Sequence, residues 1–516
     1  CIKYIGPFAF HHCSNLKTVV FPKKSELISI GEYSFAYTSI EKISFPSKLE
    51  EICDFAFQNY GKLNTIEFPS ESKIHTIGKG AFYDSSIESV LFPSSVKTVG
   101  NSAFSFCRRL KVIQFEENTK IEKIGQNAFS FTAIESIKIP SNLAEIEKEC
   151  FASCSNLKKI EFYPDTKLKI IREMAFYNSG IESITIPPSV EIIEKYAFYL
   201  CDSLKAISFS EDSELQSFEP YVFSLTSIES LSIPPKLNEC KQNWCFDTSL
   251  LKSISVINNK RFKFVDDKFL VYKSDEKSDI FDVLLFVNRG IEKAVVPSYI
   301  RIICSHSFSQ CNQLQTIEFS KDSELKIIEK NSFAYSSIES IYLPSTVEKI
   351  EQNAFFECRS LKSIHNFENL QIKTIEDFTF SSTNIESISI PSKVVEIKDN
   401  CFVETKKLNR IFVSPNNHSY LFINDSFLVK KTDQNSSVFD VLLFSRRNIH
   451  NPIIPSFITK ISPYAFNDCS NIGTVTFEKN SKLSSIGKSA FSNSSIDKII
   501  LPSSLKIIGE YAFCEC

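Results

Sequence analysis

The chain has 516 residues, 43% of them hydrophobic, which is enough for a substantial core. Its 58 Lys and Arg residues against 61 Asp and Glu give a formal charge of -3, so there is no positive excess to neutralise phosphates, and we expect neither nucleic acid nor an anionic membrane surface as a partner. No stretch approaches the roughly 18 consecutive apolar residues that a membrane-spanning helix requires.

Two series of aliphatic residues recur along the chain. Leucines stand 47 residues apart, at Leu16, Leu63, Leu110, Leu157, Leu204 and Leu251. Isoleucines follow the first five of these leucines after 24 residues, at Ile40, Ile87, Ile134, Ile181 and Ile228, which divides each 47-residue unit into 24 plus 23. Such a period is typical of turns that bury their apolar faces only against their neighbours. We predict one solenoid over residues 1–516, with about 20 turns of 23 or 24 residues.

Each turn begins with a predicted strand. From Ser183 to Ile186 apolar residues alternate with small polar ones, which predicts a strand with one buried face. A proline follows, and because proline cannot donate to a ladder it should end each strand at the same level. This proline recurs in ten turns, at positions 46, 93, 140, 187, 234, 297, 344, 391, 455 and 502.

A second inward pair, such as Ala197-Phe198, comes later in the turn. We expect its phenylalanines to stack from turn to turn as a spine that includes Phe104, Phe129, Phe151, Phe176, Phe198, Phe333 and Phe355. Glycines share one slot before this pair, and we interpret them as turn residues with positive φ. They are Gly31, Gly78, Gly100, Gly125, Gly487 and Gly509.

The 16 cysteines do not predict disulfides. Cys107, Cys154 and Cys201 are two turns apart, so their Cα atoms should lie about 10 Å from each other, beyond the roughly 7 Å limit for a bridge. Because Ser or Thr fills the same slot in intervening turns, we expect the thiols to hydrogen-bond a backbone at a bend or to fill a tight space.

We expect no enzyme, no cofactor and no metal site. The sequence has no C-x-x-C pair, and the adjacent histidines His11 and His12 have no partnering carboxylate, which favours a solvated surface pair. Nothing breaks the repeat to place a nucleophile, a base and an orienting group in one sheltered cleft.

Two turns are longer than the rest. Leu251 to Ile291 spans 40 residues and Leu408 to Ile449 spans 41, where other turns have 24. Alternating apolar runs parted by polar segments predict hairpin insertions over 258–290 and 416–448. The hairpins either widen the sheet or form binding lobes. N-x-S sequons begin at Asn417, Asn424, Asn435 and Asn493 and would matter only in a secreted eukaryotic protein.

The turn Ile338–Cys358 resembles the BspA-like leucine-rich repeat family, whose turns read L-x-x-I-x-I-P-x-x-V-x-x-I-G-x-x-A-F-x-x-C. The resemblance covers essentially the whole chain, and the phrasing N-S-S-I-E-S-I is similar to the protist-type branch. The long turns resemble a variant with a D-G-V-L-type hairpin, in which Asp267 and Asp425 replace its glycine. The resemblance implies a right-handed horseshoe with a concave parallel β-sheet and a convex side of short helical turns or irregular segments.

Family members are often cell-surface antigens linked to adhesion. The resemblance therefore implies a non-enzymatic cell-surface or secreted scaffold that contacts proteins or glycans of a host cell or matrix; the alternative is an intracellular structural or regulatory scaffold. We expect the concave face to bind through Leu91, Lys138, Thr185, Ser232, Tyr342 and Ser389. That face should be polar and lack aromatic or arginine clusters. Because the chain starts and stops within a turn, we expect a fragment without caps, signal or anchor.

Overall fold

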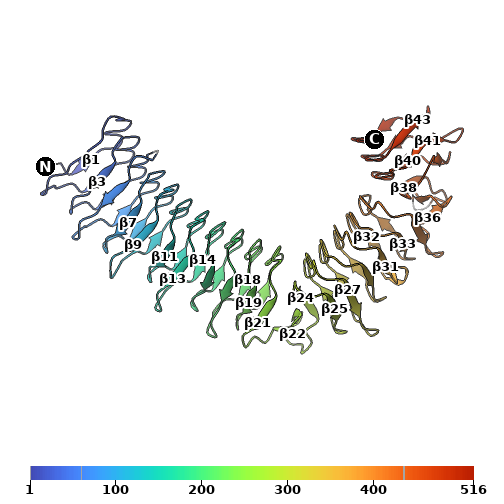
Figure 1. Ribbon diagram of the computed structural model, residues 1–516, viewed down its shortest axis with the longest axis horizontal. Helices are drawn as coiled ribbons and strands as arrows, with labels where there is room; N and C mark the ends of the chain where they lie inside the picture. Colours follow the sequence, from blue (N-terminus) through green and yellow to red (C-terminus); the bar gives the residue numbers. More distant parts are fainter. Residues whose placement is uncertain (1, 60, 434–435) are drawn as a thin grey trace. The chain divides into compact units, whose positions relative to one another are not determined.

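The computed structural model describes residues 2–59, 61–433 and 436–516, in two compact units, Cys1–Arg261 and Phe262–Cys516. Each unit is a stack of coils in which almost every strand pairs in parallel with its equivalent in the next coil (Figure 1). The one helical element of the described residues is the 3-10 helix η1 (Phe367–Asn369). The prediction of a repeat solenoid with a parallel sheet is confirmed, whereas a single uninterrupted solenoid over 1–516 stays a prediction.

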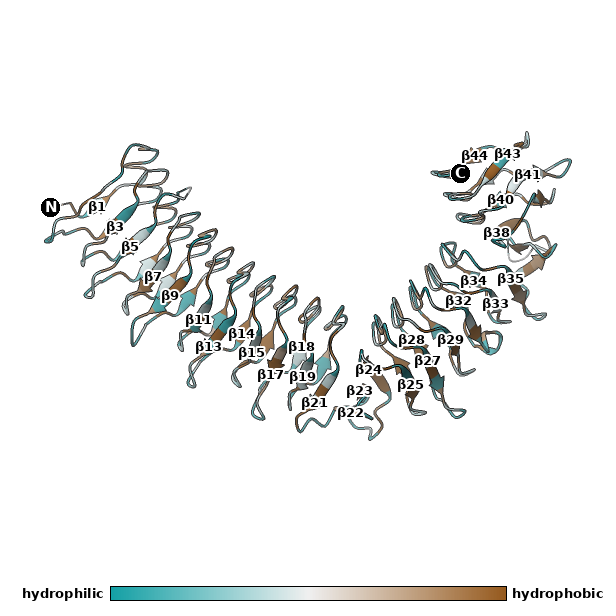
Figure 2. Ribbon diagram, viewed as in Figure 1, coloured by the Kyte–Doolittle hydropathy of each residue, from teal (hydrophilic) through white to brown (hydrophobic). Residues whose placement is uncertain are grey.

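Every regular coil contributes two strands rather than the one that we predicted. The predicted strand forms the main ladder, and a two-residue strand, whose second residue is Val or Ile in most coils, forms a second ladder. Strands β7 (Ser89–Phe92), β11 (Ser136–Ile139) and β19 (Ser230–Ile233) end at the residue before the proline, as expected from its missing N–H, whereas β3 (Lys42–Ser44), β15 (Ser183–Thr185) and β29 (Ser340–Tyr342) end one residue earlier. Hydrophobic and hydrophilic residues alternate around the coils (Figure 2).

In the first unit, the main ladder consists of β3 (Lys42–Ser44), β5 (Thr65–Glu67), β7 (Ser89–Phe92), β9 (Val112–Phe115), β11 (Ser136–Ile139), β13 (Lys159–Phe162), β15 (Ser183–Thr185), β17 (Ala206–Ser208), β19 (Ser230–Ile233) and β21 (Ser253–Val256). The second ladder consists of β1 (Tyr4–Ile5), β2 (Ser29–Ile30), β4 (Glu51–Ile52), β6 (Thr76–Ile77), β8 (Thr98–Val99), β10 (Lys123–Ile124), β12 (Glu145–Ile146), β14 (Ile170–Ile171), β16 (Ile192–Ile193), β18 (Ser217–Phe218) and β20 (Glu239–Cys240). Equivalent residues of successive coils therefore lie side by side, as in the pair Ile184 and Ile207.

In the second unit, the main ladder consists of β25 (Lys293–Val296), β27 (Thr316–Phe319), β29 (Ser340–Tyr342), β31 (Ser363–His365), β33 (Ser387–Ile390), β35 (Arg410–Val413), β39 (Ile453–Ile454), β41 (Gly473–Phe477) and β43 (Ile496–Ile499). The second ladder consists of β26 (Ile302–Ile303), β28 (Ile327–Ile328), β30 (Lys349–Ile350), β32 (Thr374–Ile375), β34 (Glu396–Ile397), β40 (Lys460–Ile461), β42 (Ser485–Ile486) and β44 (Ile507–Ile508).

The phenylalanines at the predicted spine positions are buried and stacked. Phe104 and Phe129 have ring centroids 5.6 Å apart, and Phe176 and Phe198 are 5.3 Å apart. Phe151 stacks between Phe129 and Phe176. In the second unit Phe333 and Phe355 stack at 5.1 Å. All seven side chains are 0–1% exposed, so the rings form the core opposite the main ladder.

The interpretation of the shared glycine slot is wrong. None of those six glycines has a positive φ; the left-handed residue comes two positions later, as at Gly80 (φ 57°), Ser102 (55°) and Asn127 (56°). In these coils the glycine instead allows a close approach of successive backbones. A Cβ on Gly100 would lie 2.5 Å from the carbonyl carbon of Gly78, nearer than real Cβ contacts allow.

The cysteine thiols at this repeat position donate hydrogen bonds to the backbone of the preceding coil, as we expected. Cys107 Sγ donates to the Phe82 carbonyl at 3.2 Å and Cys154 Sγ to the Phe129 carbonyl at 3.1 Å. The serine or threonine of the preceding coil contacts the same sulfur, at 3.2 Å between Ser85 and Cys107. Cys107, Cys154 and Cys201 are free thiols.

We expect these buried thiols to be unreactive in the folded protein. Burial raises the pKa of Cys107 to about 12 and the pKa of Cys154 and Cys201 to about 11, from an ordinary value of 9.0. In single-cysteine variants each should react with Ellman's reagent on the order of a hundredfold more slowly than exposed Cys13, and guanidinium should abolish the difference.

The same pKa shifts predict a pH dependence of stability. Because the folded state keeps these thiol protons more tightly than the unfolded chain, their stabilising contribution is complete below pH 9.0 and is lost as the pH rises toward 11 to 12. Denaturant midpoints measured between pH 8 and 11 should therefore fall for the native sequence. The fall should be smaller when Cys107 is replaced by serine. An equal fall would contradict the attribution of this pH dependence to the buried thiols.

Both predicted insertions are antiparallel hairpins that continue the second ladder. In the first, β22 (Phe262–Val265) pairs with β23 (Phe269–Tyr272), which pairs with β24 (Val283–Val287), and β24 pairs in parallel with β26. In the second, β36 (Tyr420–Ile423), β37 (Phe427–Lys430), β38 (Val441–Ser445) and β40 repeat this order and register. Each hairpin thus widens the sheet in place of one short strand.

The hairpin turns explain the two aspartates that replace the glycine of the family pattern. Asp266 and Asp267 have φ of 55° and 54°, and Asn424 and Asp425 have φ of 51° and 48°. Two successive left-handed residues form the turn that matches the twist of a tight hairpin, and Asn and Asp tolerate this conformation better than other non-glycine residues. The aspartates therefore preserve the geometry that the glycine would provide.

Asn417 anchors the second hairpin. It is 8% exposed, its amide donates to the carbonyls of Pro391 (2.8 Å) and Val394 (2.9 Å), and its carbonyl accepts from the N–H groups of Ser419 and Tyr420. In the folded chain this sequon asparagine is a structural residue. Of the other sequons, Asn424 and Asn493 are not buried, and Asn435 lies outside the described residues.

We expect Asn417→Ala to lower the free energy of unfolding of the second unit by about 2 kcal/mol, because four backbone groups lose a partner. Chemical denaturation followed by circular dichroism measures this effect. Asn416→Ala is the control, since that neighbouring side chain is exposed. Equal effects of the two changes would contradict the anchoring role.

Candidate binding faces

The outward side chains of the main ladder form a row across successive strands. In the first unit the strand pairing sets Leu91 beside Gln114, Lys138 beside Glu161, and Ser232 beside Ser255. The six residues that we predicted to bind all lie on outward positions of this ladder, on β7, β11, β15, β19, β29 and β33. Leu91 is 51% exposed and Tyr342 is 60% exposed.

Several of the predicted binding residues of the first unit are engaged by their neighbours. Lys138 Nζ lies 3.8 Å from the centroid of the Tyr163 ring, a cation–π contact. The hydroxyls of Thr185 and Ser208 are 2.9 Å apart, and the Ser232 hydroxyl accepts from the Phe209 N–H at 3.3 Å. These side chains mostly satisfy one another along the sheet.

The second unit has a different outward row. Tyr342 pairs in register with His365, and Ser389 pairs with Phe412, which is 56% exposed. Arg410 lies two residues before Phe412 on the same face of β35 and is also exposed. We call Tyr342, His365, Phe412 and Arg410 the aromatic strip.

The aromatic strip corrects the expectation that this face lacks aromatic and arginine clusters. That expectation came mainly from the strands that end in proline, where Ser and Thr fill the outward positions. His365, Phe412 and Arg410 belong to the alternate coils, whose strands carry no such proline. Extending the Tyr342 position to the following coils would have found them.

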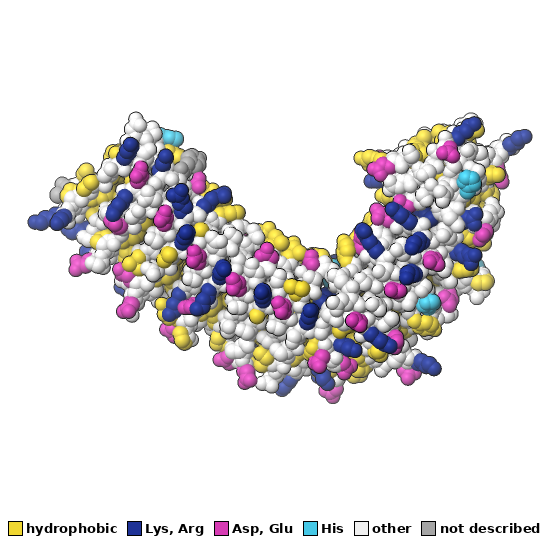
Figure 3. All heavy atoms as spheres, viewed as in Figure 1, with side chains coloured by type: hydrophobic (Ala, Val, Ile, Leu, Met, Phe, Trp, Pro, Cys, Tyr) yellow, Lys and Arg dark blue, Asp and Glu magenta, His cyan; other side chains and the backbone are white. Residues whose placement is uncertain are grey.

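Charges on the molecular surface are mixed. Lys and Arg side chains lie interspersed with Asp and Glu over the visible face (Figure 3). Many form pairs across adjacent coils, such as Lys326 with Glu348 at 2.6 Å and Lys293 with Glu318 at 2.6 Å. Exposed pairs of this kind contribute little stability, and they leave no broad field of one sign.

Over residues 2–59, 61–433 and 436–516, no three His, Cys, Asp or Glu side chains are grouped so that they could hold a metal ion. In the same part of the chain, no helix has the length and apolar character needed to cross a membrane.

The stacked coils, the two parallel ladders and the phenylalanine core define a leucine-rich-repeat solenoid. A family model described as "BspA type Leucine rich repeat region (6 copies)" matches residues 1–111, 75–179, 156–269, 281–409 and 432–516. The chain belongs to the BspA-type leucine-rich repeat family. A comparison with curated proteins found no match.

Solved structures similar to this chain include several bacterial proteins. A leucine-rich repeat protein from Eubacterium ventriosum is 18% identical, with a TM-score of 0.51 over 72% of this chain and 85% of that one. A leucine-rich repeat protein from Bacteroides ovatus is 22% identical (TM-score 0.49, 76% and 88% covered). The pneumococcal vaccine antigen PcpA is 20% identical (TM-score 0.44, 73% and 83% covered). At these identities the likeness shows the fold alone.

Proposed function

We propose that this chain is a non-enzymatic binding scaffold displayed at a cell surface or secreted, which contacts proteins or glycans of a host cell or matrix through the outward face of its main ladder. The observation that carries this proposal is the aromatic strip of the second unit. Exposed aromatic side chains beside an arginine are the residue types that dominate binding energy at protein interfaces. The remaining outward residues, from Leu91 and Lys138 to Ser389, extend this face as a broader and weaker contact area.

The strip favours a protein ligand over a glycan on this face. Tyr342 and Phe412 expose 60% and 56% of their area in a region where the sheet supplies small neighbours such as Ser363 and Ser389. Rigid aromatic side chains bury a large apolar area on binding at a small cost in conformational entropy. Burial of both rings would provide the desolvated centre that a protein interface requires.

Binding of the purified chain to a panel of immobilised extracellular-matrix proteins tests the proposal. Tyr342→Ser and Phe412→Ser should each weaken the strongest interaction by about tenfold or more. Tyr335→Ser is a matched control, because Tyr335 is 46% exposed but lies on the turn segment that packs beside Phe356 rather than on the strand face. Equal loss with Tyr335→Ser, or no effect of the two strip variants, would contradict the proposal.

The second candidate is an intracellular structural or regulatory scaffold. It is favoured by the buried free thiols Cys107, Cys154, Cys201, Cys311 and Cys358, since proteins that fold in oxidising compartments usually carry disulfides. Antibody staining of intact and permeabilised cells separates the two candidates. Staining only after permeabilisation would reject surface display.

A further inference from the structure

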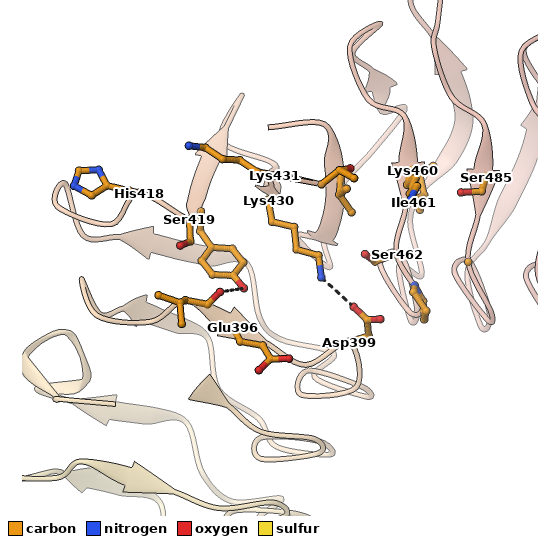
Figure 4. A pocket seen from close by; sticks show the side chains of 16 residues that line it. Glu396, Asp399, His418, Ser419, Lys430, Lys431, Lys460, Ile461, Ser462 and Ser485 are labelled. Atoms are coloured by element: carbon orange, nitrogen blue, oxygen red, sulfur yellow. Dashed lines mark hydrogen bonds and ion pairs between the residues drawn. The ribbon is translucent and has the colours of Figure 1, made fainter. Parts of the chain in front are cut away.

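A cavity of about 660 Å³ lies beside the second hairpin, on the second ladder rather than on the aromatic strip (Figure 4). One row of paired residues crosses it, from Tyr420 on β36 through Lys430, Val441 and Lys460 to Ser485 on β42. Residues that pair directly across a sheet point to the same face. The cavity is therefore built by regular strand pairing within the second unit.

The floor of the cavity is rigid. Tyr420 is 3% exposed, and its hydroxyl accepts a hydrogen bond from the Ile397 N–H at 2.7 Å, at the place where a neighbouring strand would otherwise pair with β34. Val441 is 6% exposed, beside Tyr420 and Lys430 in the hairpin. The polar side chains at the rim thus project from a floor that is held in place without any ligand.

The first hairpin has the same strands, register and bulge, but different residues occupy the positions of this row. There the equivalent residues are Phe262, Tyr272, Val283, Ile302 and Ile327. Two lysines and a serine of the second hairpin thus replace Tyr272, Ile302 and Ile327. The first hairpin thus folds with an aromatic and two aliphatic residues at these three positions.

The rim combines positive charge with hydrogen-bond acceptors. Lys430 Nζ lies 3.6 Å from Asp399 Oδ1, and Figure 4 shows the two side chains pointing toward each other across the cavity. Lys431 Nζ lies 5.0 Å from the centroid of the Phe439 ring. Glu396 and the hydroxyls of Ser462 and Ser485 also line the cavity.

We propose that this cavity binds one carboxylated sugar residue, a uronic acid at the end of or within a glycan. Three lysines (Lys430, Lys431 and Lys460) and two carboxylates (Glu396 and Asp399) line it, so its lining carries one surplus positive charge for a single anionic group. Glu396 is in addition paired with Lys398 at 2.6 Å. The lysines donate to the sugar carboxylate in charge-assisted hydrogen bonds. The carboxylates and serine hydroxyls accept from the sugar hydroxyls.

The same lining disfavours other anions. A phosphate with two negative charges would meet Glu396 and Asp399 with no arginine in the cavity to offset them. An acidic peptide would bring several carboxylates to a site with one surplus charge. The cavity is large enough for a sugar ring, and its lining of Val395, Val441 and Ile461 beside lysines and serines suits a ring with both hydroxyls and an apolar face.

Isothermal titration of the full chain with methyl β-D-glucuronide tests this proposal. We expect saturable binding, a loss of about tenfold in affinity with Lys430→Tyr and with Lys460→Ile, and no binding of methyl β-D-glucoside, which lacks the carboxylate. Both substitutions introduce the residue found in the first hairpin, so the sheet should accept them. Lys123→Ile is the control, because Lys123 opens the short strand β10 as Lys460 opens β40.

Three outcomes would overturn the proposal: no binding of the glucuronide at millimolar concentration, equal binding of the glucoside, or equal affinity in the Lys460→Ile variant. Tighter binding of inorganic phosphate or of a hexaglutamate peptide would also overturn it. The result is independent of the strand-face function, since Tyr342→Ser and Phe412→Ser should leave glucuronide binding unchanged.

Discussion

Replacing Phe198 with alanine is expected to lower the free energy of unfolding of the first unit by about 3 to 5 kcal/mol, among the largest effects of any single change in this chain. Phe198 is fully buried, and its ring stacks between those of Phe176 at 5.3 Å and Phe223 at 6.1 Å. Removing it leaves a ring-sized void between coils whose backbone hydrogen bonds prevent collapse.

Trp244 reports on this change. It is the only tryptophan of the sequence, it is buried in the same unit, and it contacts Phe223, the next ring of the spine. Guanidinium unfolding followed by its fluorescence should shift to lower denaturant in Phe198→Ala. Leu91→Ala, at a side chain that is 51% exposed, should lower the free energy of unfolding by less than about 1 kcal/mol. An unchanged midpoint in Phe198→Ala would contradict the spine.

Replacing Arg447 with methionine is expected to destabilise the second unit by about 3 kcal/mol. The guanidinium is 2% exposed and donates to the carbonyls of Ala465 at 3.1 Å and Phe402 at 3.0 Å, while it stacks over Phe444 at 4.3 Å. The second hairpin interrupts the regular hydrogen bonds between coils here, and the arginine joins the coils on either side. Methionine fills the space but removes both hydrogen bonds that link the coils, and the two carbonyls keep only the donors of nearby segments, the Ser445 N–H at 2.9 Å and the Thr405 hydroxyl at 2.7 Å.

Hydrogen exchange measured by mass spectrometry locates this effect. In Arg447→Met the peptides around residues 402 and 465 should exchange faster, while peptides of the first unit should not change. Arg446→Met is the control, since that neighbouring side chain forms only an exposed ion pair with Asp425 at 3.5 Å. Equal protection in Arg447→Met and the native chain would show that the arginine does not join the coils.

The first hairpin contains an equivalent buried arginine, Arg289. The repeat pattern of the sequence does not predict that this side chain is buried. Arg289 is 5% exposed, donates to the Ser307 carbonyl at 2.7 Å and lies over Phe286 at 4.5 Å. Both arginines follow the run Val-Leu-Leu-Phe by three residues. A basic residue in a loop normally indicates a solvated surface, and only the surrounding coils make it a buried donor.

The sequence by itself determined the elements in which a residue packs against its equivalent in the next coil. Identical spacing places Ile184 beside Ile207 and Phe104 beside Phe129, because a coil of fixed length returns each residue to the same position. The strands of the main ladder, their ends before proline, the two hairpins and the thiol hydrogen bonds all followed from that periodicity.

The tertiary structure decided what depends on contacts between unlike segments. The short strands of the second ladder have two residues each, too few for a periodic pattern, and exist because the next coil supplies their hydrogen bonds. The glycine slot reflects the distance between successive backbones, which no single coil specifies. The aromatic strip and the cavity beside Lys430 arise where strands from different coils, or a hairpin and the coils after it, bring side chains into one row.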